Sequence, residues 1–368
     1  RSHEGYINFV GASNLGDEHL MHTFWREAAT AQDQLKRRVA FALSQIFVIS
    51  LENTSLQDFR RGVASYMDML TRNAFGNYRQ LLQDVTLHPM MGLYLSHLRN
   101  RKEDPALNRV PDQNYAREVM QLFSIGLYRL NPDGTLMLDG NGQPIETYGP
   151  NDIVGLSRVF TGFSWAGCSN TSTNCFNGSG TQSPNREVMP MQAFPQFHSI
   201  SEKTFLGTTI AASTASDPMA ELRRALDVIA SHPNVGPFIG RQLIQRLVTS
   251  NPSPAYVGRV AQAFNSGRYQ SGAYVVGTGQ RGDLKATVAA ILLDIGKTRE
   301  FQLGAEIALS EAGALVGHVV LGQQLVAERA RRLDGFPEAK LHALSHCILA
   351  HHGPDGLRHI ATRVHRLA

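Results

Sequence analysis

Apolar residues recur every three or four positions through most of the chain, the period that places them on one face of an α-helix. In the first half this pattern predicts helices over residues 35–51, 55–73, 78–86, 111–126 and from 151 to about 165. A further helix begins at Asp217-Pro218, because aspartate caps helix starts and proline is tolerated in the first turn. The remaining helices are expected over residues 237–250, 254–266 and 282–294. The sequence therefore predicts an all-α, multi-helical fold.

Two stretches interrupt the helical period. In the sequence NPDGTLMLDGNGQPI, Asp133-Gly134 stands between short apolar runs, which is typical of a small β-hairpin. Residues 166–209 are rich in Gly, Ser, Asn and Thr and predict a long irregular loop. Long ordered loops often carry function, so this loop is a natural place to search for a site.

Composition excludes several classes of protein. With 42% hydrophobic and 18% charged residues, the chain can bury a core. The formal net charge of +4 is too small to indicate a protein that coats nucleic acid. We expect no membrane span, because no apolar stretch reaches the roughly 18 residues that one needs. The chain opens with Arg1 and without the apolar core of a signal peptide, so we expect that its natural beginning has been cut away.

The predicted helix over residues 111–126 carries Arg117 and Glu118 on its polar face. One interpretation is that the two side chains lock neighbouring helices through salt bridges and hydrogen bonds. The other pairs Glu118 with His88, His97 or His198 in a cleft, as acid and base or as metal ligands. The sequence leaves both open, and we take Arg117 and Glu118 as candidate catalytic residues.

His198 and Lys203 are candidate catalytic residues as well. Both lie in the string FHSISEKTFLG within the predicted loop, where side chains are more available for chemistry than in a helical core. The pattern is equally compatible with a structural role, with substrate positioning and with catalysis.

Cys168 and Cys175 also lie in this loop. In an exported protein they are expected to form a disulfide, whereas in the cytosol they would be free thiols. A zinc pair is less consistent with their spacing, because six residues separate them and no further Cys or His is adjacent.

Long strings in the first 294 residues resemble the bacterial family called domain of unknown function 1800. They are RRVAFALSQIFVIS, NAFGNYRQLLQDVTLHPMMGLYLSHLRNRKED, PDQNYAREVMQLFSIGLYRLNPDGT, YGPNDIVGLSRVFTGFSW, FHSISEKTFLG and DLKATVAAILLD. The resemblance covers residues 3–294. It implies a helical bacterial protein that is exported or periplasmic, has no assignable reaction, and acts with a partner of sulfatase-like fold.

The histidines are unevenly distributed. Seven of the 14 fall in the last 74 residues, after residue 294. The stretch from 294 to about 353, which includes GHVVLG and LAHHG, resembles HD-domain metal phosphohydrolases of the 3′-to-5′ exoribonuclease type. This second resemblance implies a cytoplasmic enzyme that cleaves RNA or nucleotides with a divalent metal (Mn, Mg, Fe or Zn). The implied metal ligands are Asp294, His318, His351 and His352.

This second resemblance is incomplete. Leu293 occupies the position of the histidine that should precede Asp294, and the helix that would supply an earlier histidine is absent. A ligand set reduced in this way implies an impaired metal site. The sequence therefore predicts a chimeric chain, with a truncated helical domain of unknown function over residues 1–294 and a partial HD-like helical segment over residues 295–368. Whether it is an enzyme stays open at this point.

Overall fold

The computed structural model describes residues 17–168, 171–179, 181–215, 217–271, 274–292, 301–303, 307–309, 311–332, 337–339, 341–342 and 345. This part of the chain is mostly helical and divides into two compact units. The first comprises residues up to 131 and 135–239, and the second comprises 132–134 and everything from 240 onward. The domain boundary expected at residue 294 lies outside the described residues and stays a prediction.

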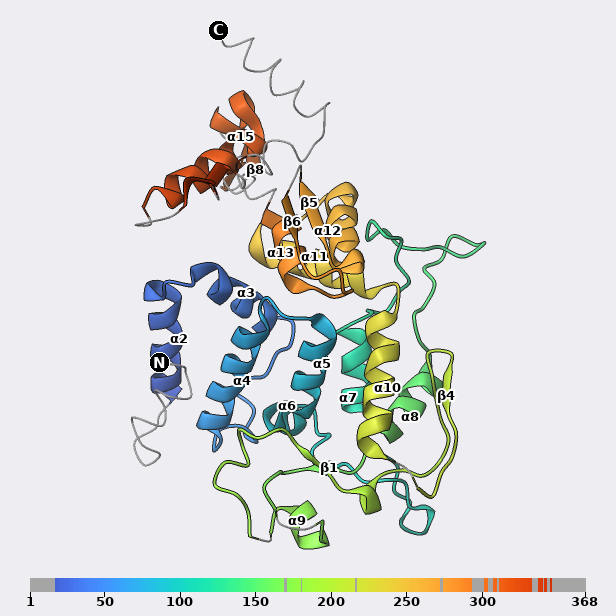
Figure 1. The fold of residues 1–368 in the computed structure, drawn as a ribbon. Helices are drawn as coiled ribbons and strands as arrows, with labels where there is room; N and C mark the ends of the chain where they lie inside the picture. The colour runs from blue at the N-terminus through green and yellow to red at the C-terminus, as the bar shows by residue number, and fades with distance from the viewer. Residues whose placement is uncertain are drawn as a thin grey trace. The chain divides into compact units, whose positions relative to one another are not determined.

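Most helices belong to the first unit (Figure 1). They are α2 (Asp17–Thr30), α3 (Gln34–Ser44), α4 (Arg60–Asn73), α5 (Tyr78–Leu87), α6 (Pro89–Tyr94), α7 (Asn114–Gln121), α8 (Pro150–Val159), α9 (Thr173–Asn177) and α10 (Pro218–Ser231). Two short 3₁₀ helices, η2 (Pro105–Leu107) and η3 (Pro195–Phe197), accompany them. Helix α4 packs on α3 and α5, and α10 packs on α5 and α8. The core between them is aromatic, with Phe47, Tyr78, Tyr115, Phe123 and Phe160 fully buried.

Two small antiparallel sheets complete this unit. One pairs β1 (Phe163–Ser164) with β2 (Gln192–Ala193), and the other pairs β3 (Lys203–Phe205) with β4 (Thr208–Ile210). The expectation of an all-helical unit with one hairpin and an irregular loop is therefore too simple, because the loop over 166–209 contains α9, η3 and most of these strands.

The predicted hairpin around Asp133-Gly134 is also more elaborate. Three chain segments pair in a closed cycle, in which Arg129 N donates to Ile145 O (2.7 Å), Met137 N to Arg129 O (2.8 Å), and Ile145 N to Met137 O (3.1 Å). Each segment is thus hydrogen-bonded to both of the others, whereas a hairpin would pair only two.

Helix α11 (Val235–Leu247) continues from the first unit into the second. The second unit contains α12 (Pro254–Ser266), β5 (Tyr269–Ser271), β6 (Tyr274–Val276), α13 (Leu284–Leu292), β7 (Phe301–Leu303), β8 (Ile307–Leu309) and α15 (Glu311–Ala330). Helices α12 and α13 pack together, and the Tyr256 hydroxyl donates to Ile291 O at 2.6 Å. Strand β5 pairs with β6, and β7 with β8.

Several helices are shorter than their apolar pattern predicts. Helix α3 ends at Ser44, although Ile46 and Phe47 beyond it are buried. The Phe47 carbonyl accepts a hydrogen bond from Tyr66 (2.8 Å), so a tertiary contact replaces the helical one. Likewise α7 covers only Asn114–Gln121 of the expected residues 111–126. The spacing of apolar residues at these helix ends therefore indicates burial, and buried residues need not be helical.

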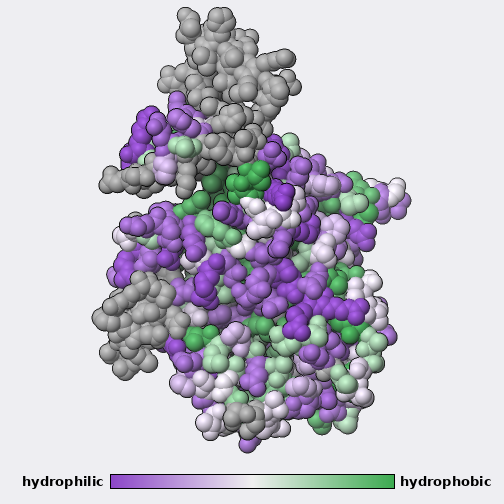
Figure 2. Space-filling view, in the orientation of Figure 1, coloured by the Kyte–Doolittle hydropathy of each residue, from purple (hydrophilic) through white to green (hydrophobic). Residues whose placement is uncertain are grey.

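Hydrophilic side chains cover most of the face drawn in Figure 2, and hydrophobic ones form smaller patches between them. Within the described residues, none of the helices combines the length and the apolar character that crossing a bilayer requires.

Candidate functional site

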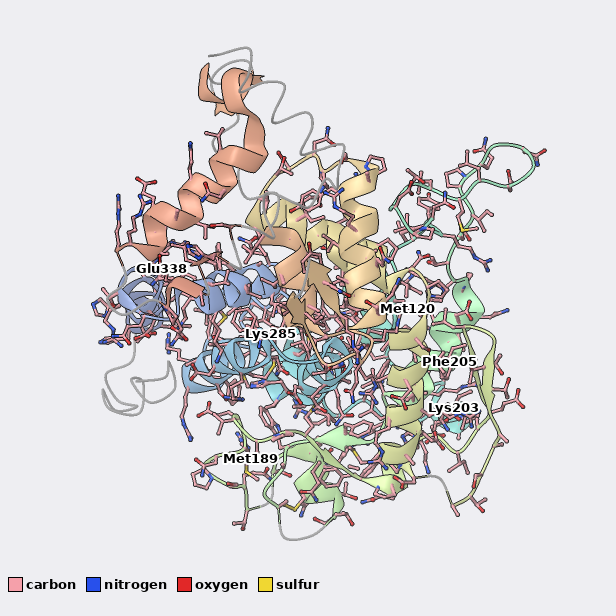
Figure 3. The ribbon with its side chains drawn as sticks, turned by 45° about the horizontal axis from the view of Figure 1, so that its top comes forward. Met120, Met189, Lys203, Phe205, Lys285 and Glu338 are labelled. Atoms are coloured by element: carbon pink, nitrogen blue, oxygen red, sulfur yellow. A yellow bond between two sulfur atoms is a disulfide. The ribbon has the colours of Figure 1, made fainter. Side chains whose placement is uncertain are left out.

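Two of the predicted site residues, His198 and Lys203, meet a residue that the sequence did not single out, Glu221 on α10. His198 Nε2 lies 3.0 Å from Glu221 Oε2, and Lys203 Nζ lies 2.9 Å from the same oxygen. Figure 3 shows Lys203 beside α10, with Phe205 next to it on β3. The His198 and Lys203 side chains are 0% and 1% exposed, and Glu221 is 9% exposed.

The ring of His198 is held from both ends. Its Nδ1 lies 2.7 Å from the Thr161 carbonyl oxygen, which can only accept a hydrogen bond. Its Nε2 faces the carboxylate of Glu221, another acceptor. These two contacts fix the orientation of the ring between the Thr161 backbone and α10.

The ammonium group of Lys203 has a partner for each of its three protons. Besides Glu221, the Ser199 carbonyl oxygen lies 2.7 Å from Nζ and the Ser201 carbonyl oxygen 3.2 Å. These two carbonyls belong to the segment that joins His198 to β3. Lys203 therefore holds this segment against α10, and no proton of its ammonium group is left for a substrate.

Two glycines permit this close packing. Gly162 has a φ of +77°, and a Cβ there would lie 2.8 Å from His198 N. Gly155 on α8 lies against β3 so closely that a Cβ would come within 1.8 Å of the Thr204 carbonyl oxygen. The backbone at His198 and at β3 can reach α8 only because these two positions lack side chains.

A second carboxylate fixes the same segment from the other side. Ser199 Oγ donates to Glu103 Oε1 at 2.9 Å, and Ser201 Oγ donates to the same oxygen. Burial raises the pKa of Glu103, but the hydrogen bonds from Ser201 and Ser199 outweigh it, and the pKa lies below its ordinary value. Glu103 is therefore ionised at neutral pH.

Arg117 and Glu118 form a separate cluster on α7. Arg117 is exposed and Glu118 half-buried. Burial raises the pKa of Glu118 above its ordinary value, although the positive charge of Arg117 opposes the shift. Tyr148 belongs to the same cluster, since its hydroxyl lies 3.3 Å from Gln121 Oε1 and its pKa, which burial raises, responds to both Arg117 and Glu118.

The histidines considered as partners of Glu118 lie elsewhere. His97 Nε2 lies 2.8 Å from the Thr86 carbonyl oxygen, and its ring stacks on Tyr115 at 3.9 Å. His88 Nδ1 accepts from Met90 N at 3.3 Å. Burial lowers the pKa of His97 to about 4 and that of His88 to about 3, so both are neutral core residues at pH 7.

Cys168 and Cys175 are joined by a disulfide, with their Cα atoms 6.0 Å apart. Cys175 and Phe176 are on α9, and they pack with Phe194 in a small apolar cluster that Cys168 and Phe197 border. The bond closes the start of the long loop over this cluster.

The predicted metal ligands fall largely beyond what the structure describes. Asp294, His351 and His352 lie outside the described residues, and His318 is in α15, whose described side chains begin at Leu321. In the part of the chain that is described, no three His, Cys, Asp or Glu side chains are grouped so that they could hold a metal ion.

The spacing of Glu221 from apolar residues indicates its burial, although the sequence analysis did not single it out. It lies four residues before Ala225 and eight before Ile229, both fully buried on α10. A glutamate at this spacing lies on the apolar face of the helix, where an ionised side chain requires a partner. Asp217 at the helix start is an ordinary cap that donates nothing to the site, since its carboxylate accepts from Met219 N and Ala220 N.

A surface cavity lies apart from both clusters. It opens between α2, α3 and α4, has a volume of about 380 Å³, and is walled mainly by apolar side chains that include Trp25, Phe41, Tyr66 and Met67. A smaller cavity of about 40 Å³ adjoins it and shares Phe24, Trp25, Phe41 and Met67 as wall residues. The described residues thus offer a buried ionic cluster, a half-exposed acid and an open apolar cavity.

Comparison with models of protein families gives a match over most of the chain. The model of a family described as protein of unknown function (DUF1800) matches residues 12–304. No curated protein and no solved structure matches the chain.

Proposed function

Because the chain belongs to the DUF1800 family, whose description assigns no reaction, we propose its function from its own geometry: it is an exported helical protein that binds an apolar ligand in the cavity between α2, α3 and α4. The observation that carries this proposal is the cavity itself. Its volume of about 380 Å³ lies within the range of about 300–1,000 Å³ that small-molecule sites occupy, and it opens to solvent.

Burial of the ionic cluster supports binding over catalysis by His198 and Lys203. A catalytic group has to touch its substrate, but these side chains are 0% and 1% exposed and already bonded to Glu221. We assign them a positioning role, in which they hold the segment between His198 and β3 on α10.

The test uses the neutral apolar dye N-phenylnaphthylamine, whose fluorescence rises in apolar sites. Wild-type protein is expected to bind it with one-to-one stoichiometry. Ser44→Trp, which adds an indole to the cavity wall, should weaken binding at least tenfold. Gln45→Trp is the matched control, since Gln45 is exposed and is not a wall residue. Equal dye binding by the two variants, or none by the wild type, would overturn the proposal.

Export is the second part of the proposal. The disulfide between Cys168 and Cys175 supports it, because such bonds persist in oxidising compartments and are rare in the cytosol. Alkylation of natively expressed protein followed by mass spectrometry should find both thiols protected. Alkylation of both would contradict export and favour a cytoplasmic location.

The family resemblance also implies a partner of sulfatase-like fold, and we propose that the chain acts with such a partner. Its support is the resemblance alone. Co-expression of the two should give a complex that survives size-exclusion chromatography at physiological salt. Separate elution of two folded proteins would count against the partnership.

Acid–base catalysis at Glu118 is a second candidate function. The observation that favours it is a half-buried carboxyl group whose pKa burial raises, beside Arg117 and Tyr148. Any hydrolytic activity found in the wild type should disappear in Glu118→Gln, although the variant stays folded. The acid limb of the pH dependence of this activity should follow the raised pKa of Glu118. Undiminished activity in the variant would exclude this role.

The HD-type alternative, a phosphohydrolase acting on RNA or nucleotides with Mn, Mg, Fe or Zn, rests on the resemblance of residues 294–353. The family match over residues 12–304 overlaps it by only eleven positions. Stoichiometric metal in purified protein, together with phosphodiesterase activity that His318→Ala abolishes, would establish it. A metal-free protein without this activity would dismiss it.

A further inference from the structure

We propose that the cavity between α2, α3 and α4 takes a carboxylate with an unbranched hydrocarbon tail of about ten to twelve carbons, its tail in the larger cavity and its carboxylate at Arg38. This inference rests on the proposed binding function and adds the chemical class of the ligand.

The walls of the larger cavity suit a hydrocarbon. Trp25 is 63% exposed and Phe41 39% exposed, so two large apolar side chains face solvent where soluble proteins usually bury them. The Tyr66 hydroxyl is already bonded to the Phe47 carbonyl oxygen, which leaves the ring as an apolar wall. A tail placed here would remove both exposed rings from water.

The volume sets the length of the tail. A group of the size of a water molecule or a methylene occupies roughly 30 Å³. The cavity of about 380 Å³ therefore holds a chain of roughly a dozen carbons. The rings of Phe24 and Phe41, with centroids 5.5 Å apart, line both the larger cavity and the smaller one.

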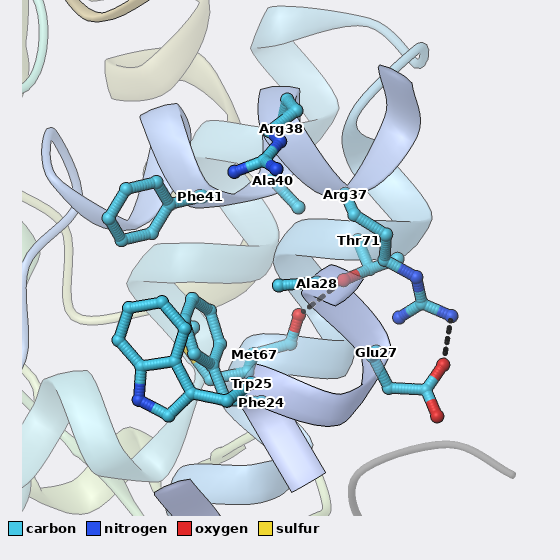
Figure 4. A pocket seen from close by; sticks show the side chains of 10 residues that line it. All are labelled: Phe24, Trp25, Glu27, Ala28, Arg37, Arg38, Ala40, Phe41, Met67 and Thr71. Atoms are coloured by element: carbon cyan, nitrogen blue, oxygen red, sulfur yellow. Dashed lines mark hydrogen bonds and ion pairs between the residues drawn. The ribbon is translucent and has the colours of Figure 1, made fainter. Parts of the chain in front are cut away.

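Charge distinguishes the two ends. Arg38 lines only the smaller cavity, where Figure 4 shows its guanidinium beyond Ala40 and beside Phe41. The neighbouring Arg37 is engaged by Glu27 (3.3 Å) and Asp33 (3.1 Å), and Glu27 also contacts Arg26. Among the described residues no acidic side chain is paired with Arg38, so its guanidinium can bind a carboxylate.

The one carboxylate in the larger cavity fixes the orientation. Glu52 lines this cavity and not the smaller one. It would repel an anionic group placed at its own end. At the other end the wall residue Glu27 is already paired with Arg37, and Arg38 adds a positive charge that attracts one. The head group of a cationic amphiphile of the same length would be repelled by Arg38.

The experiment measures displacement of N-phenylnaphthylamine by dodecanoate, dodecanol and dodecylammonium below their critical micelle concentrations. Dodecanoate is expected to bind at least tenfold more tightly than dodecylammonium. Shortening the acid should weaken binding about fourfold for each methylene removed. Arg38→Gln should weaken dodecanoate at least tenfold and leave dodecanol unchanged. Lys36→Gln, the same charge change on the same helix but outside both cavities, should alter neither.

The outcomes separate this inference from the function beneath it. Dye binding with no displacement by dodecanoate, or displacement that ignores Arg38→Gln, overturns the ligand class and leaves the binding function standing. Failure of the dye itself to bind overturns both. Sedimentation with phosphatidylglycerol vesicles that depends on Trp25 and Arg38 would assign the surface to membranes and overturn the inference as well.

Discussion

Lys203 Nζ and Glu221 Oε2 lie 2.9 Å apart in a setting from which water is almost excluded, although 17 residues separate them along the chain. Such a pair gains little over an apolar replacement, since desolvation offsets the attraction, but breaking it leaves an uncompensated charge in the interior. The segment from His198 to β3 is therefore fixed to α10 by a contact that is costly to break.

Lys203→Met is expected to destabilise the fold by about 3–5 kcal/mol, because it leaves the Glu221 charge with His198 alone. Adding Glu221→Gln should recover part of this loss, which urea denaturation of the single and double variants would measure. Lys36→Met on the surface of α3 is the control and should cost less than about 0.5 kcal/mol. A cost below about 1 kcal/mol for Lys203→Met would show that the buried pair does not fix the segment to α10.

Gly162→Ala should destabilise more than Gly207→Ala, although both glycines have positive φ values of +77° and +73°. A Cβ at Gly207 meets nothing within 4 Å, so that variant carries only the backbone penalty of about 1–2 kcal/mol. A Cβ at Gly162 would also lie 2.8 Å from His198 N and 2.9 Å from the Phe194 carbonyl oxygen. Equal melting temperatures for the two variants would contradict the close approach.

Acid should destabilise the protein before its carboxylates are neutralised, because burial lowers the pKa of His97 from 6.5 to about 4. The unfolded chain takes up this proton as pH falls below about 6.5, and the folded chain only near pH 4. The contribution of His97 to the free energy of unfolding is therefore fully present above pH 6.5. About 3 kcal/mol of it is lost as the pH falls from 6.5 to 4. His97→Gln should flatten the pH dependence of the urea midpoint across this window, and an unchanged slope would argue against a neutral buried imidazole.

Glu118 should act in the opposite sense. Its pKa is raised, so the folded state favours the protonated form and the ionised carboxylate destabilises the fold at neutral pH. Glu118→Gln is expected to raise the melting temperature at pH 7 and to lose this advantage at pH 4. Asp112→Asn, a neighbouring exposed carboxylate, is the comparison in differential scanning fluorimetry. A lower melting temperature for Glu118→Gln at pH 7 would show a favourable ion pair instead.

Reduction of the Cys168–Cys175 disulfide should lower stability by about 2–3 kcal/mol, the loop-closure value for so short a loop. Cys168→Ser should cause the same loss, and adding reductant to this variant should change nothing more. Thermal unfolding with and without reductant measures both effects. A further loss on adding reductant to the variant would point to another oxidised thiol.

Local chemistry made parts of this fold predictable. The start of α10 at Asp217-Pro218 and the bounds of α12 at residues 254–266 were predicted correctly. Capping residues and first-turn prolines affect only the few residues next to them, so their effect can be predicted from local sequence. Gly126, the last residue of the helix expected over residues 111–126, has a left-handed conformation with a φ of +71°. Helix ends that depend on tertiary partners, as at Phe47, could not be read from periodicity.

The candidate site was predictable only in part for the same reason. His198 and Lys203 stood out as polar residues in a loop, but their partner Glu221 is on a helix 18 residues beyond Lys203, where its burial alone gives it meaning. The sequence predicted that Glu118 pairs with a histidine, but in the fold the three candidate histidines contact Thr86, Met90 and Glu221 instead. Which of several histidines meets a carboxylate depends on how helices pack, and spacing along one chain does not contain that information.

The closed pairing of Arg129, Met137 and Ile145 has a consequence for aggregation. A two-stranded arm would leave outer backbone groups open to pair with another molecule, and this one also exposes Leu136 and Leu138. At the three central residues each segment is donor to one neighbour and acceptor to the other, so no edge is left there as a template. Deleting residues 143–147 would open the ring and should make the protein self-associate through β-structure.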